Sequence, residues 1–222
     1  YSWTFGDGAV ATQPIANHTY AAPGSYTVTL TVTDDDGATN TATRQLTVTN
    51  PAAANVAFRA ATGTNTNSAS STLTIPAQVQ PGDLMVMIAT TNTTGSLTGP
   101  AGWTLVDSGT STGAGTTSAL WSRVAAPGDA GSTVAVSNTT VSKTALQLAA
   151  YANAGSISAR ALSFDGVNRA ERTTPIVPVV TAGSALVSYW ADKSGATTAW
   201  ALPGAVQQRD LSVGVGGGHI TA

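Results

Sequence analysis

The chain has no cysteine and very few charged residues, and these two shortages exclude several kinds of protein. Without cysteine there is no disulfide, no thiolate nucleophile and no zinc–thiolate site. Only 9% of the 222 residues are charged, against about 25% in typical soluble domains. The surface is therefore expected to consist mainly of Ser, Thr, Asn, Gln and Gly.

Basic clusters and long apolar runs are scarce as well. The net charge is −2 and Lys and Arg are not clustered, which argues against nucleic-acid binding. No apolar stretch approaches the roughly 20 residues that span a bilayer, so we expect no membrane span. The low-charge, Thr-rich composition is similar to that of secreted bacterial proteins and predicts an extracellular or cell-surface location.

Residues 25–48 carry the clearest structural pattern. From residue 25 to 33, Tyr, Val and Leu alternate with Ser and Thr, a period of two that is typical of a half-buried antiparallel strand. Asp34-Asp35-Asp36-Gly37 follows, and Asp-Gly favours a hairpin turn because glycine tolerates a positive φ. A returning strand is expected over 39–48, with Leu46 and Val48 facing inward.

Three motifs surround this hairpin: Trp-x-Phe-Gly-Asp-Gly at 3–8, His-x-Tyr at 18–20, and Pro-Gly-x-Tyr-x-Val-x-Leu-x-Val-x-Asp at 23–34. Together they resemble the second half of a PKD domain, an immunoglobulin-like β-sandwich of secreted and cell-surface proteins. The resemblance covers residues 1–50 and implies that His18 and Tyr20 belong to the packed framework. Such a sandwich needs about 100 residues, so we expect its first strands to come from preceding chain or a partner.

Asn50-Pro51 is expected to separate two modules, at 1–50 and 51–222, because proline donates no hydrogen bond to a strand ladder. The sequence of the second module predicts a large number of short strands separated by turn residues. This pattern favours a sandwich or jelly roll. The strands are expected at 55–60, 72–76, 83–90, 103–108, 117–125, 132–137, 143–152, 158–165, 175–180, 184–191, 206–212 and 218–222.

A weak repeat relates 79–88 to 180–189, each followed by a polar loop and a Pro-containing turn. Gene duplication and convergent turn chemistry both explain it. The second module also resembles a β-sandwich of bacterial surface and phage-associated proteins, through Pro81–Leu84, Pro100–Val106 and Trp121–Ala125. The fold class predicted for the chain is all-β: a partial PKD sandwich followed by a jelly-roll-like sandwich, for which an incomplete C-terminal end is an open alternative.

No catalytic motif is convincing. Gly109–Gly113 matches Gly-x-Ser-x-Gly, but no helix is signalled after it and the chain has only two histidines. The acids beyond residue 50 lie mostly beside Gly, Ser or Asn, where turn formation explains them better than paired-carboxylate hydrolysis. We therefore predict that the chain is not an enzyme.

Two candidate binding sites remain. Asp34, Asp35 and Asp36 offer carboxylate oxygens of the kind that calcium prefers, although an acidic hairpin loop explains them too; no other cofactor is expected. Trp103 and Trp200 flank Gly/Pro turns, where an exposed indole would stack on a neutral polysaccharide, although burial explains both as well.

Three functions fit these observations. The favoured one is a non-catalytic extracellular spacer or adhesive, polymer-binding part of a larger exported protein. The second is a structural subunit of an extracellular filament, surface layer or phage particle. The third is an accessory region of a secreted enzyme whose catalytic domain lies elsewhere. The expected partners are neighbouring domains or subunits of the parent protein and a polysaccharide.

Overall fold

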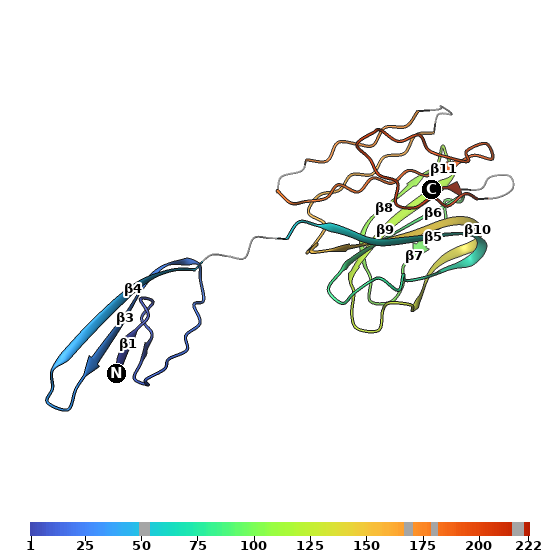
Figure 1. Cartoon of the computed structure of the whole chain (residues 1–222). Helices are drawn as coiled ribbons and strands as arrows, with labels where there is room; N and C mark the ends of the chain where they lie inside the picture. The colour runs from blue at the N-terminus through green and yellow to red at the C-terminus, as the bar shows by residue number, and fades with distance from the viewer. Residues whose placement is uncertain (49–53, 167–170, 179–181, 215–219) are drawn as a thin grey trace. The chain divides into compact units, whose positions relative to one another are not determined.

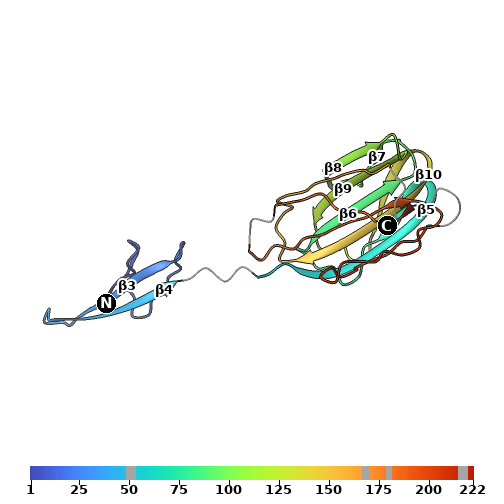
Figure 2. The same ribbon diagram turned by 90° about the horizontal axis from the view of Figure 1, so that it is seen from above.

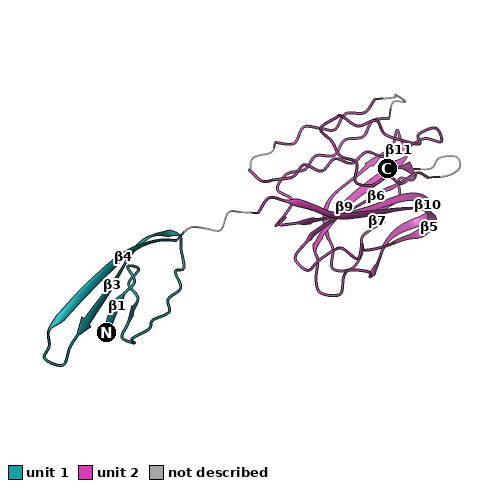
Figure 3. Cartoon of the chain, in the orientation of Figure 1, with its two compact units in different colours: residues 1–53 teal, residues 54–222 magenta. Residues whose placement is uncertain are grey.

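The computed structural model describes residues 1–48, 54–166, 171–178, 182–214 and 220–222. The chain forms two compact units, Tyr1–Ala53 and Ala54–Ala222 (Figure 3). The predicted boundary at residues 50 and 51 lies outside the described residues. The described residues contain strands and turns but no helix (Figure 1), so the all-β prediction is confirmed.

The first unit is a single antiparallel sheet of four strands in the order β2-β1-β3-β4. The strands are β1 (Ser2–Thr4), β2 (Val10–Ala11), β3 (Gly24–Thr33) and β4 (Thr39–Val48). Gly37 has φ +85°, and the Asp34 carboxylate accepts the N–H groups of Asp36 and Ala38. The predicted Asp-Gly hairpin is therefore formed, and it sets the register between β3 and β4.

The apolar side of this sheet is only partly covered. Val28, Leu30 and Val32 are half-buried, and Phe5 is the one hydrophobic side chain among the unit's described residues that is fully buried. Leu46, predicted to face inward, is 40% exposed. The reason is that no second layer of the described residues of this unit packs on the sheet.

The second unit is built on one large antiparallel sheet in the order β5-β10-β6-β9-β8, and β7 pairs with β10. The strands are β5 (Ala57–Thr74), β6 (Leu84–Thr91), β7 (Leu97–Thr98), β8 (Thr104–Ser111), β9 (Thr116–Val124) and β10 (Thr133–Ala152). A small separate pair joins β11 (Asp192–Lys193) to β12 (Ile220–Thr221).

Two long strands correct the predicted boundaries. The strands expected at 55–60 and 72–76 are the two ends of the 18-residue β5, and those expected at 132–137 and 143–152 are both parts of the 20-residue β10. Residues 61–71 look like a loop in the sequence because they are rich in Gly, Asn, Ser and Thr. Pairing with β10 along nearly the whole length of β5 overrides that local preference.

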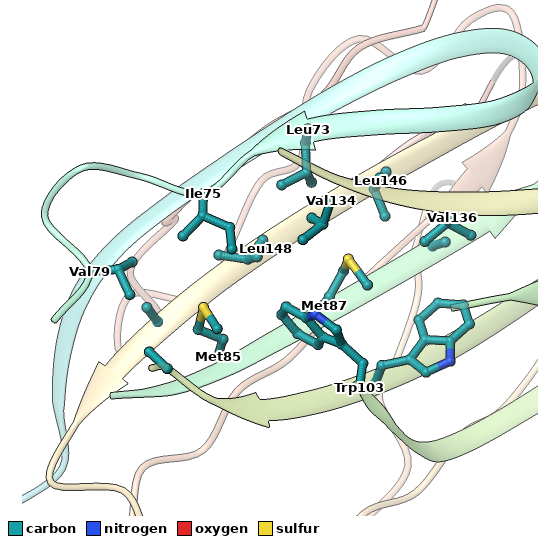
Figure 4. Packing of buried hydrophobic residues seen from close by; sticks show 14 of the residues in the cluster. Leu73, Ile75, Val79, Met85, Met87, Trp103, Val134, Val136, Leu146 and Leu148 are labelled. Carbon is teal, nitrogen blue, oxygen red and sulfur yellow. The ribbon is translucent and has the colours of Figure 1, made fainter. Parts of the chain in front are cut away.

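The main core lies on one face of the large sheet. Met85 and Met87 project from β6, and Ile75 and Val134 pack with them (Figure 4). Trp121 of β9 belongs to the same cluster. The described segments after residue 153 lie over the other face as a second layer (Figures 1 and 2). There Tyr151 and Leu84 pack against Ile157, and Ala145 packs against Ile220.

Part of this second layer differs from the prediction. The strands expected at 158–165, 184–191 and 206–212 are not paired strands, and the one at 175–180 lies partly outside the described residues. The segment 184–191 instead contacts the large sheet through side chains, as where the Tyr189 hydroxyl donates to Thr90 Oγ1 at 3.0 Å. Alternating sequence marks an extended segment, but a ladder also requires a neighbouring backbone in register.

Candidate functional site

The three motifs of the first unit meet in one line of contacting rings, called the aromatic line, in which His18 and Tyr20 meet edge to face and the other pairs are stacked. The ring centroids of Trp3 and Phe5 are 6.5 Å apart, those of Phe5 and His18 are 4.3 Å apart, and those of His18 and Tyr20 are 4.6 Å apart. Tyr20 then stacks on Tyr26 at 4.1 Å, and its hydroxyl donates to Phe5 O. The prediction that His18 and Tyr20 belong to the packed framework is confirmed.

The middle ring of this aromatic line, His18, is held by an acid. His18 Nε2 lies 2.6 Å from Asp7 Oδ2, and Asp7 Oδ1 accepts the Ala9 N–H. The hydrogen bond with His18 is the main cause that lowers the pKa of the Asp7 carboxyl. Asp7 lies in the turn between β1 and β2 and His18 lies after β2, so the pair joins these two segments and stabilises the local fold.

The predicted calcium ligands lie in the hairpin between β3 and β4. Asp34 uses Oδ1 to accept two backbone N–H groups, so that oxygen already has partners inside the turn. Across the described residues, no group of three or more His, Cys, Asp or Glu side chains is placed to hold a metal ion. Calcium at Asp34, Asp35 and Asp36 stays a prediction.

The two predicted ligand-binding tryptophans lie in different surroundings. Trp103 is 9% exposed and packs in the main core beside Met87 (Figure 4), and its Nε1 has no hydrogen-bond partner among the described residues. A buried indole offers no accessible face for sugar stacking, which favours a structural role for Trp103. Trp200 is half-buried, and its Nε1 is also buried.

The segment that matches Gly-x-Ser-x-Gly forms part of a hairpin. Ser111 ends β8, and its Oγ accepts the Ala114 N–H at 3.2 Å. A turn then leads into β9, whereas a nucleophile elbow requires a strand followed by a helix. Of the two histidines, His18 is held by Asp7 and His219 lies outside the described residues.

Two acids of the second unit occupy turns of the same sequence, Pro-Gly-Asp. Asp83 N–H donates to Gln80 O, and Asp83 Oδ2 accepts the Gln80 N–H. Asp129 makes the same two bonds with Ala126. The expectation that these acids are turn residues is confirmed for both.

Each of these turn carboxylates also binds an arginine. Arg59 Nε and Nη2 donate to the two Asp83 oxygens at 2.9 and 3.0 Å. This hydrogen-bonded pairing with Arg59 is the main cause that lowers the pKa of the Asp83 carboxyl. Arg123 Nη2 pairs with Asp129 at 2.8 Å. The two turns are structural, and they form a clearer repeat than the one predicted between 79–88 and 180–189.

Asp210 is the acid with the least favourable surroundings. Its Oδ2 is buried, with no hydrogen-bond partner in the described part of the chain. Burial raises the pKa of the Asp210 carboxyl. The carboxylate lies against the backbone of Gly63, where a Cβ would meet Asp210 Oδ2 and Ser212 Oγ in their present positions.

A groove that the sequence did not predict lies along β7, β8 and β9, with a volume of about 430 Å³. Leu97 and Leu105 are its largest apolar side chains, and Thr110 Oγ1 lies 3.0 Å from Thr117 Oγ1. The full lining is Ser96, Leu97, Leu105, Ser108, Gly109, Thr110, Thr117 and Ala119. All are uncharged, so the groove suits a neutral ligand. Alternation of polar and apolar residues in β8 and β9 indicates that these strands have two different faces. It does not indicate which face remains accessible to a ligand.

Among solved structures, the chain is similar to one described as "Structural basis for the promiscuous specificity of the carbohydrate-binding modules from the beta-sandwich super family". The match covers 68% of this chain and 77% of that one, with 17% identity and a TM-score of 0.23. At that level it carries no argument about function. No helix among the described residues is long and apolar enough to cross a membrane.

Curated relatives match short segments of this chain. The microbial collagenase of Vibrio alginolyticus is 46% identical over 46 residues, which are 21% of this chain and 6% of the relative. Collagenase ColA of Clostridium perfringens is 44% identical over 48 residues, 22% of this chain and 4% of the relative. The pre-pro-metalloprotease PrtV of Vibrio cholerae is 43% identical over 51 residues, 23% and 6% respectively.

The chain therefore spans only about one twentieth of the length of these relatives. The family model that matches is that of the PKD domain, over residues 1–49. The aromatic line and the β3–β4 hairpin both lie within this range. That the matching residues are the second half of a PKD domain stays a prediction. The predicted resemblance to the family is confirmed: residues 1–49 are a PKD domain.

Proposed function

We propose that the chain is a non-catalytic accessory region of a larger exported protein and that it attaches that protein to a neutral extracellular polymer. The PKD domain at residues 1–49 carries this proposal. In the relatives, the matching segment is a small part of proteins named collagenase or pre-pro-metalloprotease. We propose an extracellular location as well, and the relatives named collagenase support it, because collagen is an extracellular substrate.

The surroundings of the acids and of Ser111 support a non-catalytic role. Asp83 and Asp129 are neutralised by arginines, and Ser111 Oγ is engaged by a turn. A general acid or nucleophile needs a reacting group within hydrogen-bond reach in an accessible site. These three side chains are instead committed to the fold.

The neutral groove supports a neutral ligand. Its hydroxyl groups can exchange hydrogen bonds with a polyhydroxylated chain, while Leu97 and Leu105 offer apolar contact. Pockets for ligands have typical volumes of about 300–1,000 Å³, and the groove falls in this range at about 430 Å³. A charged polymer would find no counter-charge among the lining residues.

Retention on insoluble polymers tests the proposal. The purified chain is mixed with crystalline cellulose, chitin or fibrous collagen, and the bound fraction is measured after pelleting. We expect retention on a polysaccharide that persists in about 1 M salt, where charge interactions are screened, with no soluble product released. Leu105→Asp should weaken retention, and Val141→Asp, at a 68% exposed position outside the groove, is the matched control. Absence of retention on all three polymers would contradict polymer binding.

Self-assembly is the second candidate function. β4 is an edge strand with Arg44 as its one charged residue, and nearly all of it is exposed. Such an edge presents unpaired backbone groups that can pair with another copy. Sedimentation velocity over a range of concentrations would detect assembly, and Leu46→Lys should abolish it. A monomer at all concentrations would exclude this candidate.

A further inference from the structure

A buried carboxyl group lies between the second layer and the edge strand β5. Asp210 and Ser212 lie against the backbone of Gly63, where an added Cβ would meet Asp210 Oδ2 and Ser212 Oγ in their present positions. Gly63 pairs with Gln147 of β10, and directly paired residues share a face of the sheet. Gln147 Nε2 donates to Ala222 O at 2.6 Å. The contact with Asp210 therefore lies on the sheet face that the second layer covers.

The segment 206–214, which carries Asp210, is held by few contacts among the described residues. Ser212 exchanges two backbone hydrogen bonds with Ala222, at 2.7 and 3.0 Å, and the Arg209 guanidinium lies 4.2 Å from the centroid of the Phe58 ring. Residues 206–212 do not form a paired strand. Segments with few protected backbone hydrogen bonds open locally at a lower free-energy cost than a packed sheet. Opening of 206–214 therefore does not require the large sheet to unfold.

The Asp210 carboxyl group is poorly placed to carry a charge. Its Oδ2 is buried and has no hydrogen-bond partner in the described part of the chain. Burial raises the pKa of this carboxyl, and the backbone N–H of Leu211 opposes that effect only in part. Asn65 Nδ2, a neutral donor on the same face of β5 as Gly63, is buried without a partner too. The closed arrangement therefore favours the neutral, protonated form of Asp210.

Charged and titratable groups on the surrounding elements do not offset a charge on Asp210. Arg209 lies over a phenyl ring, and Arg59 of β5 is held by the acid of a Pro-Gly-Asp turn. Lys143 of β10 is paired four positions along β5 from Gly63, a distance of roughly 13 Å. Two phenols of this region remain neutral because burial raises their pKa: Tyr151 and Tyr189.

We propose that Asp210 is a pH-sensitive latch, which in its protonated form holds the segment 206–214 closed over β5 and in its ionised form favours an open state. In the open state the carboxylate reaches water, and Arg209 leaves the Phe58 ring. The latch goes beyond the attachment to a polymer and does not depend on it.

The direction of the switch follows from proton release. The pKa of Asp210 is raised in the closed state and returns to its ordinary value in water, so opening at intermediate pH releases a proton. The ratio of open to closed molecules should therefore rise by up to about tenfold for every pH unit between the ordinary and the raised pKa. Above the raised pKa the ratio is constant, and below the ordinary pKa the segment stays closed.

Hydrogen–deuterium exchange of the full chain between about pH 4 and pH 8 tests the latch. Peptides that contain Ser212 and Ala222 report opening, because the backbone amides of these two residues are hydrogen-bonded only in the closed arrangement. Wild type is compared with Asp210→Asn at each pH, so the intrinsic exchange rate cancels. The matched control is Glu171→Gln, which removes an exposed acid from the second layer. Every variant keeps Ala222 as its last residue, so any charge at that end cancels as well.

Wild type and Asp210→Asn should exchange equally in acid, where residue 210 is neutral in both. Toward pH 8 the two peptides should exchange faster in wild type, up to the ratio given above, while Glu171→Gln follows wild type. Equal exchange of wild type and Asp210→Asn at every pH overturns the latch. A pH effect that extends equally to β6 and β9 also overturns it, because it would mark global unfolding.

Gly63→Ala is a second, independent variant. Its added Cβ occupies the space of Asp210 Oδ2 and Ser212 Oγ, so the segment should be open at every pH. Exchange in acid should therefore be as fast as that of wild type at pH 8, after correction for the intrinsic rate. This variant decides the matter if Asp210→Asn does not fold, and protection of Ser212 in acid equal to that of wild type would then overturn the latch.

Discussion

Removing Arg59 should destabilise the second unit strongly, because it leaves a buried carboxylate without its partner. The Asp83 side chain is only 4% exposed and receives two hydrogen bonds from Arg59, which is 30% exposed. Breaking a buried ion pair from one side costs about 3–5 kcal/mol. Since water can reach part of the Arg59 site, we expect Arg59→Ala to lower the free energy of unfolding by about 3 kcal/mol.

Urea unfolding followed by tryptophan fluorescence measures this loss. Trp103 and Trp121 lie in the core of the same unit and report its unfolding. The matched variant is Arg123→Ala, which breaks the equivalent pair at Asp129, a side chain that is 12% exposed. Because Asp129 keeps more contact with water, we expect a smaller loss, about 1–2 kcal/mol.

Two further measurements isolate the charge. Arg59 lowers the folded-state pKa of Asp83, so the pair stabilises the fold above the ordinary carboxyl pKa and stops doing so as pH falls through the lowered value. The difference between wild type and Arg59→Ala should therefore shrink in acid. Adding Asp83→Asn to Arg59→Ala should recover part of the stability. A pH-independent difference and no recovery would refute the buried-charge explanation.

Three other predictions concern single residues. Trp103→Ala should cost about 3–5 kcal/mol of stability and leave polymer retention unchanged, because its indole is buried; a folded variant that no longer binds would contradict this. Asp210→Asn should raise the melting temperature at pH 7 but not in acid. Burial raises the pKa of the Asp210 carboxyl in the folded state, so its ionisation destabilises the fold only above the ordinary carboxyl pKa. An unchanged melting temperature at pH 7 would argue against a destabilising buried charge. If Asp34, Asp35 and Asp36 bind calcium, calcium should raise the melting temperature and Asp35→Asn should remove that rise, whereas an unchanged melting temperature would contradict a site in this turn, where Asp34 Oδ1 accepts two backbone N–H groups.

The sequence alone predicted the parts of the fold that depend on neighbouring residues. Alternation at 25–33 and the Asp-Gly turn after it predicted the β3–β4 hairpin, because both depend only on neighbouring residues. The PKD motifs identified the first unit from its sequence as well. Each motif contributes at least one ring to the aromatic line. The Pro-Gly-Asp turns were likewise readable from adjacent residues.

Other features were decided only by pairing between distant residues. The polar run at 61–71 is strand because β10 pairs with it, and Trp103 is buried because the core forms around its turn. The alternating segment 184–191 lacks a ladder because no described backbone lies in register beside it. The threonines at 27–33 were visible as one polar row. Their union with the threonines of β4 into a single neutral face required the register that the hairpin imposes, since a shift of one residue would have turned those side chains to the other side.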